Sequence, residues 1–592
     1  MSWEVWTMKS KMSFFDATLL KKNISRFAPA WGLLTLVLFL SMPLPLMQRL
    51  GHVELAMRGA NARDLLEAMA DMGIIYSFGA AAIFAALVFK YLHKTQSAYM
   101  MHAFPMTRSC HFVTNAVSGL LFWVVPALFI TLINLTVLAA FGVTSCTGLA
   151  WAAFGKWLLA FLCFYGIAVF TMHISGRTVI AILSYCALNF IFLLIPLLVL
   201  LLVDFYFVGF DYSVPETILR LCPIVTMLRD GSGEPTVAML ISYAVLGLVL
   251  LVLAWVHYRF RQVERAGDPM VFQWARIAFR VVFTLCCALG FGWILAAFFG
   301  LLDAGRNGVF LPYALIGCFL GWFSSSMMLE RTVKVFRNKK VWLGFAVFAA
   351  VLALAVLGLK YDLLGLQRRV PETAQVESVE IWTAGNYDSP NTDCISLTEA
   401  EQIDVVRAFH QKALEDPNNQ SGARRSVFDG GYYDSLHVCY HLSGGGTLQR
   451  VYRVPEREYK ALAQLYADPE IAAAWYEKAL PEKFSRVTLD GMEEYEVDQY
   501  GNETYGTRER ACKDPAALRE AVLADAGAGR LPVVNFLTRN VILQTEGSYY
   551  QIRNELYLYF DNGVWPDGTK YSYMSIPIAS TAVETLALFE TQ

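Results

Sequence analysis

The chain has 592 residues, of which 56% are hydrophobic and only 17% are charged, and its mean hydropathy is +0.43. These values exclude an ordinary soluble protein, and a net charge of −2 gives no indication of a nucleic-acid partner. The composition predicts a membrane protein that also carries a large polar region.

Residues 1–27 are predicted to be a cytoplasmic segment that lies on the membrane surface. Apolar residues recur at helical spacing among lysines, at Phe14, Phe15, Leu19, Leu20 and Ile24. This pattern is typical of a helix at the inner leaflet, and a solvated basic tail is the alternative. A cleaved signal peptide is not expected, because the charged leader is long and prolines interrupt the apolar run that follows.

Nine apolar stretches follow, and each is long enough to cross about 30 Å of hydrocarbon. The predicted spans are 28–48, 73–92, 113–142, 151–175, 177–203, 237–257, 281–302, 310–329 and 341–360. We therefore expect a polytopic α-helical membrane protein.

Lysines and arginines alternate along the chain in a way that predicts the orientation. Clusters lie before the first span and after the second, fourth, sixth and eighth spans, whereas the other loops are mixed, acidic or uncharged. Basic residues beside spans resist translocation. The N-terminus is therefore expected in the cytoplasm and the C-terminal region outside, in a multi-pass protein of the plasma membrane.

The membrane region offers no energy source of its own. The predicted spans contain no Asp or Glu that could couple transport to an ion, and the chain has no Gly-x-x-x-x-Gly-Lys-Ser/Thr sequence for ATP. If the protein is a transporter, ATP hydrolysis must come from a partner.

The loop 93–112 is the candidate docking segment for such a partner. It is rich in soft apolar side chains, and its candidate residues are Tyr99, Met101, His102, Phe104, Pro105 and Arg108. An equally acceptable interpretation is that the loop lies on the lipid interface.

Three segments resemble ABC-2-type transporter permeases of Gram-positive bacteria. The run from Phe14 to Phe27, with the first span ending near Pro43 and Pro45, is similar to the N-terminus of those permeases. The segment from His102 to Arg108 is similar to their first cytoplasmic loop. A third motif just after the sixth span resembles one branch of the family, and its residues are Glu264, Arg265, Gly267 and Pro269.

The resemblance implies a six-helix permease core at 28–257 and three further helices at 258–360, in the branch with a C-terminal domain of unknown function. It also implies a cytoplasmic ATP-binding cassette ATPase as a partner, touched by loop 93–112, with Arg108 on its phosphate-like or acidic surface. A second permease chain, the same or related, is expected as well. The substrate stays open among drugs, lipids, peptides and antimicrobial compounds. The chief alternative is a membrane sensor or scaffold whose outer domain binds a ligand.

Gly317 and Gly321 form a Gly-x-x-x-Gly pair in the eighth predicted span. This spacing lets two helix backbones approach closely, and it predicts helix packing either within the chain or between subunits.

Residues 361–375 read as a linker, and 376–592 as an extracytoplasmic α+β domain. Alternating strands and amphipathic helices predict two β-α-β-β-α units, which could pack together as one domain. The scattered acids of this domain show no catalytic pattern, so we do not expect an enzyme.

Three potential metal ligands alternate on one predicted strand, at His437, Cys439 and His441. They share one face of that strand, which could bind zinc or copper, although a single strand rarely supplies three ligands and a plain sheet face is the more economical interpretation. No cofactor is therefore predicted. Cys394, Cys439 and Cys512 lie outside the spans and allow at most one disulfide, with no pairing that can be deduced.

Overall fold

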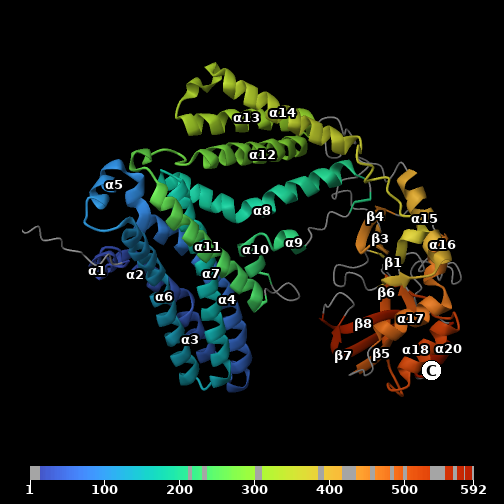
Figure 1. Ribbon diagram of the computed structural model, residues 1–592. Helices are drawn as coiled ribbons and strands as arrows, with labels where there is room; N and C mark the ends of the chain where they lie inside the picture. The colour runs from blue at the N-terminus through green and yellow to red at the C-terminus, as the bar shows by residue number, and fades with distance from the viewer. Residues whose placement is uncertain are drawn as a thin grey trace, which may run out of the picture. The chain divides into compact units, whose positions relative to one another are not determined.

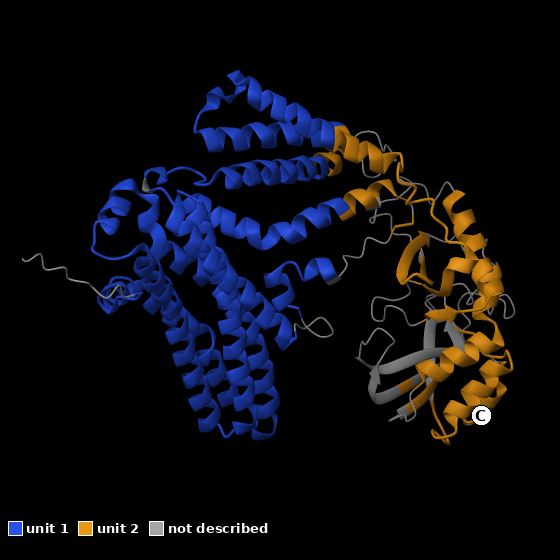
Figure 2. Cartoon of the chain, viewed as in Figure 1, with its two compact units in different colours: residues 1–199, 214–293, 312–351 blue, residues 200–213, 294–311, 352–592 orange. Residues whose placement is uncertain are grey.

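The computed structural model separates into two compact units, which are coloured in Figure 2. Unit 1 comprises residues 1–199, 214–293 and 312–351, and unit 2 comprises 200–213, 294–311 and 352–592. The structure describes residues 14–207, 209–210, 216–229, 236–299, 310–383, 393–415, 435–453, 460–480, 486–497, 503–533, 554–564, 570–578 and 581–589.

Helices make up most of the first 360 residues (Figure 1). The α-helices are α1 (Ala17–Arg26), α2 (Ala28–Ser41), α3 (Pro43–His52), α4 (Arg58–Phe89), α5 (Thr95–His102), α6 (Arg108–Ala140), α7 (Thr147–Ile174), α8 (Thr178–Tyr206), α9 (Glu216–Leu219), α10 (Pro223–Met227), α11 (Val237–Phe260), α12 (Gln273–Phe298), α13 (Phe310–Glu330) and α14 (Lys339–Lys360). Short 3-10 turns join several of them, among them η1 (Leu55–Met57), η2 (Lys90–His93) and η5 (Val263–Arg265).

Nine helical segments within the described residues are long and apolar enough to cross a membrane, which confirms the predicted number of spans. Their boundaries differ from the prediction at several ends, and two of these differences change the description of the helices. The first span is interrupted at Met42, because Pro43 opens a new helix and restricts the residue before it. The second helix starts at Arg58 rather than at Gly73, and its 32 residues are about 48 Å long at about 1.5 Å per residue, more than the bilayer core requires.

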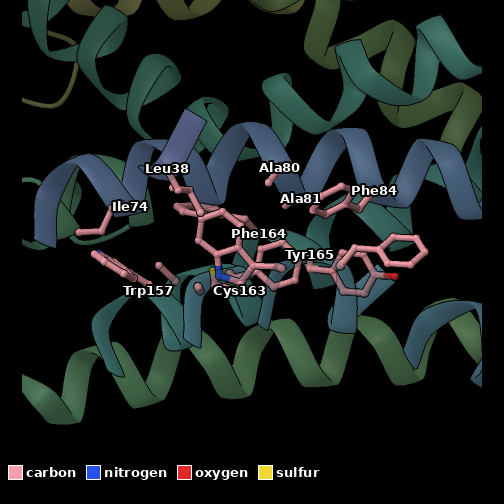
Figure 3. Packing of buried hydrophobic residues seen from close by; sticks show 14 of the residues in the cluster. Leu38, Ile74, Ala80, Ala81, Phe84, Trp157, Cys163, Phe164 and Tyr165 are labelled. Atoms are coloured by element: carbon pink, nitrogen blue, oxygen red, sulfur yellow. The ribbon is translucent and has the colours of Figure 1, made fainter. Parts of the chain in front are cut away.

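Helix α7 is the most enclosed of the spanning helices, with 78% of its apolar window buried. It packs against α4, α6 and α11. Figure 3 shows Trp157, Phe164 and Tyr165 of α7 lying against α4, from which Ile74 and Phe84 point toward them. An almost parallel stack of Trp123, Phe161 and Tyr165 extends this core toward α6.

Glycines on α4, α6 and α11 allow these helices to pack closely against α7. The indole of Trp157 lies over Gly73 of α4 and donates a 3.0 Å hydrogen bond to the Ala70 carbonyl, and the Tyr165 hydroxyl donates to Ala116 beside Gly119 of α6. On the α11 side, a Cβ at Gly166 would overlap the carbonyl oxygen of Gly247. The backbones of α7 and α11 therefore touch at a point where only glycine fits.

Helix α1 is amphipathic and rests on α6. Asp16 caps it by accepting from the Leu19 amide at 2.7 Å, and Leu19, Leu20 and Ile24 are half-buried. The buried Asn23 side chain donates to the side chains of Asn115 (2.9 Å) and Ser118 (3.0 Å). A polar anchor therefore fixes this helix on α6.

Unit 2 contains two four-stranded antiparallel sheets. The first has the order β2-β1-β3-β4 and the second the order β6-β5-β7-β8. The strands are β1 (Val376–Thr383), β2 (Ile395–Leu397), β3 (Ser435–Leu442), β4 (Gly446–Arg453), β5 (Arg486–Val497), β6 (Glu503–Ala511), β7 (Asn554–Val564) and β8 (Lys570–Ile578). The helices are α15 (Ala400–Glu415), α16 (Lys460–Tyr466), α17 (Pro469–Ala479), α18 (Leu518–Gly527) and α20 (Val583–Ala587).

The two sheets repeat one topology. In each, a hairpin is followed by a helix and then by a second hairpin, and the first strand of the unit pairs with the first strand of the second hairpin. Each half thus carries one strand more than the predicted β-α-β-β-α order, namely β2 and β6. A single hydrophobic cluster includes residues of both halves, such as Val379 and Tyr440 from the first and Leu489 and Leu556 from the second.

Candidate functional site

The loop predicted to dock a partner is a short helix, α5, between two spanning helices. Helix α5 follows η2 directly. Thr107 then caps the next helix, α6, because its side chain accepts a hydrogen bond from the Cys110 amide. The side chains of Tyr99, Met100 and Phe104 are 53%, 62% and 46% exposed. Pro105 is also exposed, whereas Met101, His102 and Arg108 are half-buried. The segment therefore presents large apolar groups outside the spans.

His102 ties α5 to the helices beneath it. One ring nitrogen, Nδ1, lies 2.7 Å from the Ala98 carbonyl, and Nε2 lies 3.1 Å from the hydroxyl of Tyr258. Tyr258 belongs to α11, is buried, and its hydroxyl lies 3.3 Å from that of Tyr91 in η2. Through His102, the exposed helix is connected to the ends of α4 and α11.

Arg108 forms its hydrogen bonds with main-chain carbonyls of this chain. Its Nη1 donates hydrogen bonds of 3.0 Å to the carbonyls of Arg259 and Arg261, where α11 ends. Carbonyls at a helix C-terminus lack intrahelical partners and carry partial negative charge, so a guanidinium is well suited to them. Arg108 thus holds the start of α6 on the end of α11, whereas the sequence predicted a contact with a partner.

Arg261 is the most enclosed cation of this region, with 4% of its surface exposed. Its Nη1 donates to the carbonyls of Met172 (3.2 Å), His173 (2.7 Å) and Ser175 (3.0 Å), and its Nη2 donates to that of Leu92 (3.0 Å). Burial lowers the pKa of its guanidinium to about 10, and Tyr91 and Tyr258 partly offset this shift, so the group stays charged at neutral pH. Arg261 thus joins the end of α7 to η2.

In the sequence, Arg261 is one of several basic residues in the cluster that follows the sixth predicted span. Its neighbour Arg259 is exposed and lies over the Trp255 ring. The sequence pattern does not distinguish the buried Arg261 from the exposed Arg259. One clue to the buried position is Tyr258, three residues earlier, whose hydroxyl lies beside Tyr91 of η2 and His102 of α5.

The predicted motif of Glu264, Arg265, Gly267 and Pro269 packs against the α7–α8 turn. The Gly267 amide donates to the Gly176 carbonyl at 2.7 Å, and Arg177 Nε donates to the Gly267 carbonyl at 2.8 Å. Gly267 has φ of +91°, which suits glycine. Glu264 and Arg265 are exposed, and Pro269 is buried.

Further contacts hold this second segment in place. Ser175 and Met270 form an antiparallel bridge, and the Val271 amide donates to the Ile174 carbonyl at 2.9 Å. Asp268 forms a 2.7 Å ion pair with Arg331, which follows α13. The docking loop and the Glu264–Pro269 motif, which the sequence pointed to separately, lie side by side, because α5 packs directly against η5.

Gly317 and Gly321 lie on the face of α13 that meets α12. A Cβ at Gly321 would lie 2.7 Å from the Cys287 Cβ and 3.0 Å from the Thr284 Cα, and one at Gly317 would overlap the Cys287 carbonyl oxygen. The close approach that this pair permits is made within the chain.

The predicted metal ligands are split by the structure of unit 2. His437 stacks on Trp382 with the ring centroids 5.1 Å apart, whereas Cys439 and His441 gather beside Glu380 of the neighbouring strand. Cys394, Cys439 and Cys512 are free thiols. Burial raises the pKa of all three thiols, that of Cys394 to about 12.

No protein-family model matches this chain, and the comparisons with curated proteins and with solved structures found no match. The geometry of the described residues must therefore carry any functional assignment.

The contacts around α5 join the ends of several helices. Exposed apolar side chains stand on α5, which His102 connects to Tyr258 of α11. Arg108 and Arg261 connect the neighbouring helix ends to one another. A partner that moved α5 would act on α4, α7 and α11 together.

Proposed function

We propose that this chain is the membrane-spanning permease subunit of an ATP-binding cassette transporter, with energy supplied by a separate cytoplasmic ATPase that docks on α5. The observation that carries the proposal is the exposure of Tyr99 and Met100 on the short helix α5, and of Phe104 in the turn that follows it, outside the spans. Large apolar groups clustered outside the hydrocarbon mark interaction sites. The substrate would be a drug, lipid, peptide or antimicrobial compound.

Coupling would run through the polar anchors of α5. ATP binding and hydrolysis would shift the ATPase, and α5 would move with it. His102 connects α5 to Tyr258 of α11, and Arg108 at the start of α6 holds the segment that follows α5 on the end of the same helix. Arg261 would pass the movement to η2 and α7. Such displacement of packed helices between two arrangements is an ordinary route for a conformational switch.

The proposed orientation places α5 in the cytoplasm of a plasma-membrane protein. An odd number of crossings puts the two ends of the chain on opposite sides, so the sheets of unit 2 would lie outside. Support comes from the basic residues that gather with α5 at one set of helix ends, namely Arg108, Arg177, Arg261, Arg265 and Arg331. A second permease chain, the same or related, would complete the translocation path.

The test is co-purification of ATPase activity with the detergent-solubilised chain from its native membrane. Phe104→Asp and Tyr99→Asp place a charge on the proposed docking surface without touching the anchors. Leu55→Asp is the matched control, because Leu55 is 77% exposed in η1, which precedes α4, whereas α5 follows it.

We expect ATPase activity in the wild-type and Leu55→Asp eluates and its loss from both α5 variants. Absence of a nucleotide-hydrolysing partner from every sample would instead favour a stand-alone membrane sensor. Equal activity in all four samples would show that the ATPase docks somewhere other than α5.

A further inference from the structure

Three side chains with metal-binding atoms converge on the polar face of the first sheet of unit 2. Glu380 lies on β1 and is paired with Cys439 on β3, while His441 follows two residues later on the same strand. Side chains alternate along a strand and cross-strand partners share a face, so all three point to one side. The opposite side carries Val379, Ile381 and other residues of the hydrophobic core.

The separations among these side chains suit a single small ion. His441 Nε2 lies 3.3 Å from Glu380 Oε2 and 4.0 Å from Cys439 Sγ, and all three ligand atoms lie within 4.8 Å of one another. A tetrahedral zinc centre would set nitrogen and oxygen ligands about 3.3 Å apart and nitrogen and sulfur ligands about 3.5 Å apart. The thiol would have to move about half an ångström closer to the imidazole to reach this separation.

The site is sheltered on one side and open on the other. Cys439 is buried with 8% of its surface exposed, whereas the side chains of Glu380 and His441 are 39% and 37% exposed. A metal held by these three groups would therefore keep one coordination position for water or another ligand, as three-ligand zinc sites do.

We propose that Glu380, Cys439 and His441 form a binding site for a zinc-type divalent metal ion on this sheet. The donor set decides the class of ion. Thiolate and imidazole suit zinc and its neighbours in the first transition row, whereas calcium and magnesium take oxygen ligands.

Binding requires the thiolate form of Cys439. Burial, and after it the charge of Glu380, raises the pKa of this thiol when no ion is present. When the metal binds, a metal–sulfur bond forms, the S–H bond breaks and the proton leaves to solvent. Affinity is thus expected to weaken as the pH falls.

The experiment uses the full detergent-solubilised chain, stripped of metal and titrated with Co²⁺ as a spectroscopic probe. Cobalt bound to a thiolate gives a sulfur-to-metal charge-transfer band in the near ultraviolet, and tetrahedral coordination gives strong visible bands. Displacement by Zn²⁺ then reports the relative affinity for zinc.

The variants separate the site from the other thiols and from neighbouring residues. Cys439→Ser and Glu380→Gln remove ligands, whereas His437→Ala changes a histidine on the same face that stacks on Trp382, and Cys394→Ser removes another thiol of unit 2. Unchanged melting temperatures without metal would verify that each variant folds.

We expect one equivalent of Co²⁺ with a charge-transfer band in the wild type, His437→Ala and Cys394→Ser. Cys439→Ser should lose the band, and Glu380→Gln should bind at least tenfold more weakly. A wild-type chain without the band, or a band that survives in Cys439→Ser, would overturn the proposal and leave Glu380 and His441 as a simple ion pair.

Discussion

The guanidinium of Arg108 donates a 3.0 Å hydrogen bond to the main-chain carbonyl of Arg261, whose own guanidinium donates to four other carbonyls. The two arginines therefore form a relay, from the start of α6 to the end of α11 and onward to η2 and α7. Neither uses a carboxylate among these contacts, so the relay depends on helix-end carbonyls, which otherwise lack partners.

Replacing Arg261 by methionine is expected to lower the stability of the helical unit by about 2–4 kcal/mol, since several buried carbonyls lose a charged donor. Arg261→Lys should recover only part of the loss, because one ammonium cannot reach carbonyls on both sides. Thermal unfolding in detergent, followed by tryptophan fluorescence, measures the effect. Lys94→Gln at an exposed position is the control. A methionine variant as stable as that control would contradict the relay.

The crossing of α7 and α11 predicts a sharp difference between two glycines of the same helix. Gly166→Ala should destabilise the protein by about 1–3 kcal/mol or more, because the new methyl group overlaps the Gly247 carbonyl and the helices must separate. Gly155→Ala should be neutral or stabilising by about 0.5–1 kcal/mol, since open space surrounds that position and alanine favours a helix. The melting temperature should therefore fall for Gly166→Ala and stay the same or rise for Gly155→Ala.

The core of unit 2 contains a histidine that should make its stability depend on pH. His410 is fully buried, with Nδ1 3.2 Å from the Tyr440 hydroxyl and its ring against Tyr452, and burial together with the nearby Arg450 lowers its pKa to about 3. The folded state therefore holds the neutral ring, while the unfolded chain takes up a proton below a pH of about 6.5. Stability should be greatest above that pH and fall by up to about 1.4 kcal/mol per pH unit below it.

Hydrogen exchange of peptides from α15, measured between pH 7.5 and 4.5 and corrected for the intrinsic exchange rate, tests this dependence. His410→Gln should flatten the profile, and Gln411→Ala, a change at an exposed neighbour, should keep the wild-type slope. Identical slopes in all three proteins would mean that His410 is protonated without cost in the folded state.

Asp525 links α18 to α20 and should be essential to the second half of unit 2. Its buried carboxylate accepts from the Thr585 amide and hydroxyl, both at 2.7 Å, and forms a 2.8 Å ion pair with Arg530. Asp525→Ala should cost about 3 kcal/mol or more, because several partners are left without an acceptor.

The matched control for Asp525 is Asp514→Ala. Asp514 is exposed and caps a turn by accepting from the amides of Ala516 and Ala517, so its loss should cost about 1 kcal/mol or less. Exchange protection of α18 and α20 distinguishes the two outcomes. Equal losses would show that the burial of Asp525 adds nothing.

The sequence was sufficient to predict the nine long apolar helices of the described residues, because such a helix is a local property of about 20 residues. It placed the turn around Ser175 and Arg177 correctly between α7 and α8. It placed the start of α4 too late, since hydropathy falls where Arg58, Arg63 and Asp64 begin, although the backbone hydrogen bonds of the helix continue through them.

The candidate sites depended on pairings that a local pattern does not contain. Alternation put Cys439 and His441 on one face, but the register between β1 and β3 is what brings Glu380 to them. In the same way, Arg108 was expected on the surface because nothing near it in sequence marks the end of α11 as its acceptor. Both cases require knowledge of which distant segments lie side by side.

The acceptors of Arg261 have a consequence for how this protein can change over evolutionary time. Every residue except proline offers the same amide geometry, and all residues offer the same carbonyl, so positions 92, 172, 173 and 175 can exchange side chains without losing the bonds to this guanidinium. For these hydrogen bonds, only the arginine side chain is required. Divergent copies of this chain could therefore share the linkage among these helices while their sequences around it drift beyond recognition.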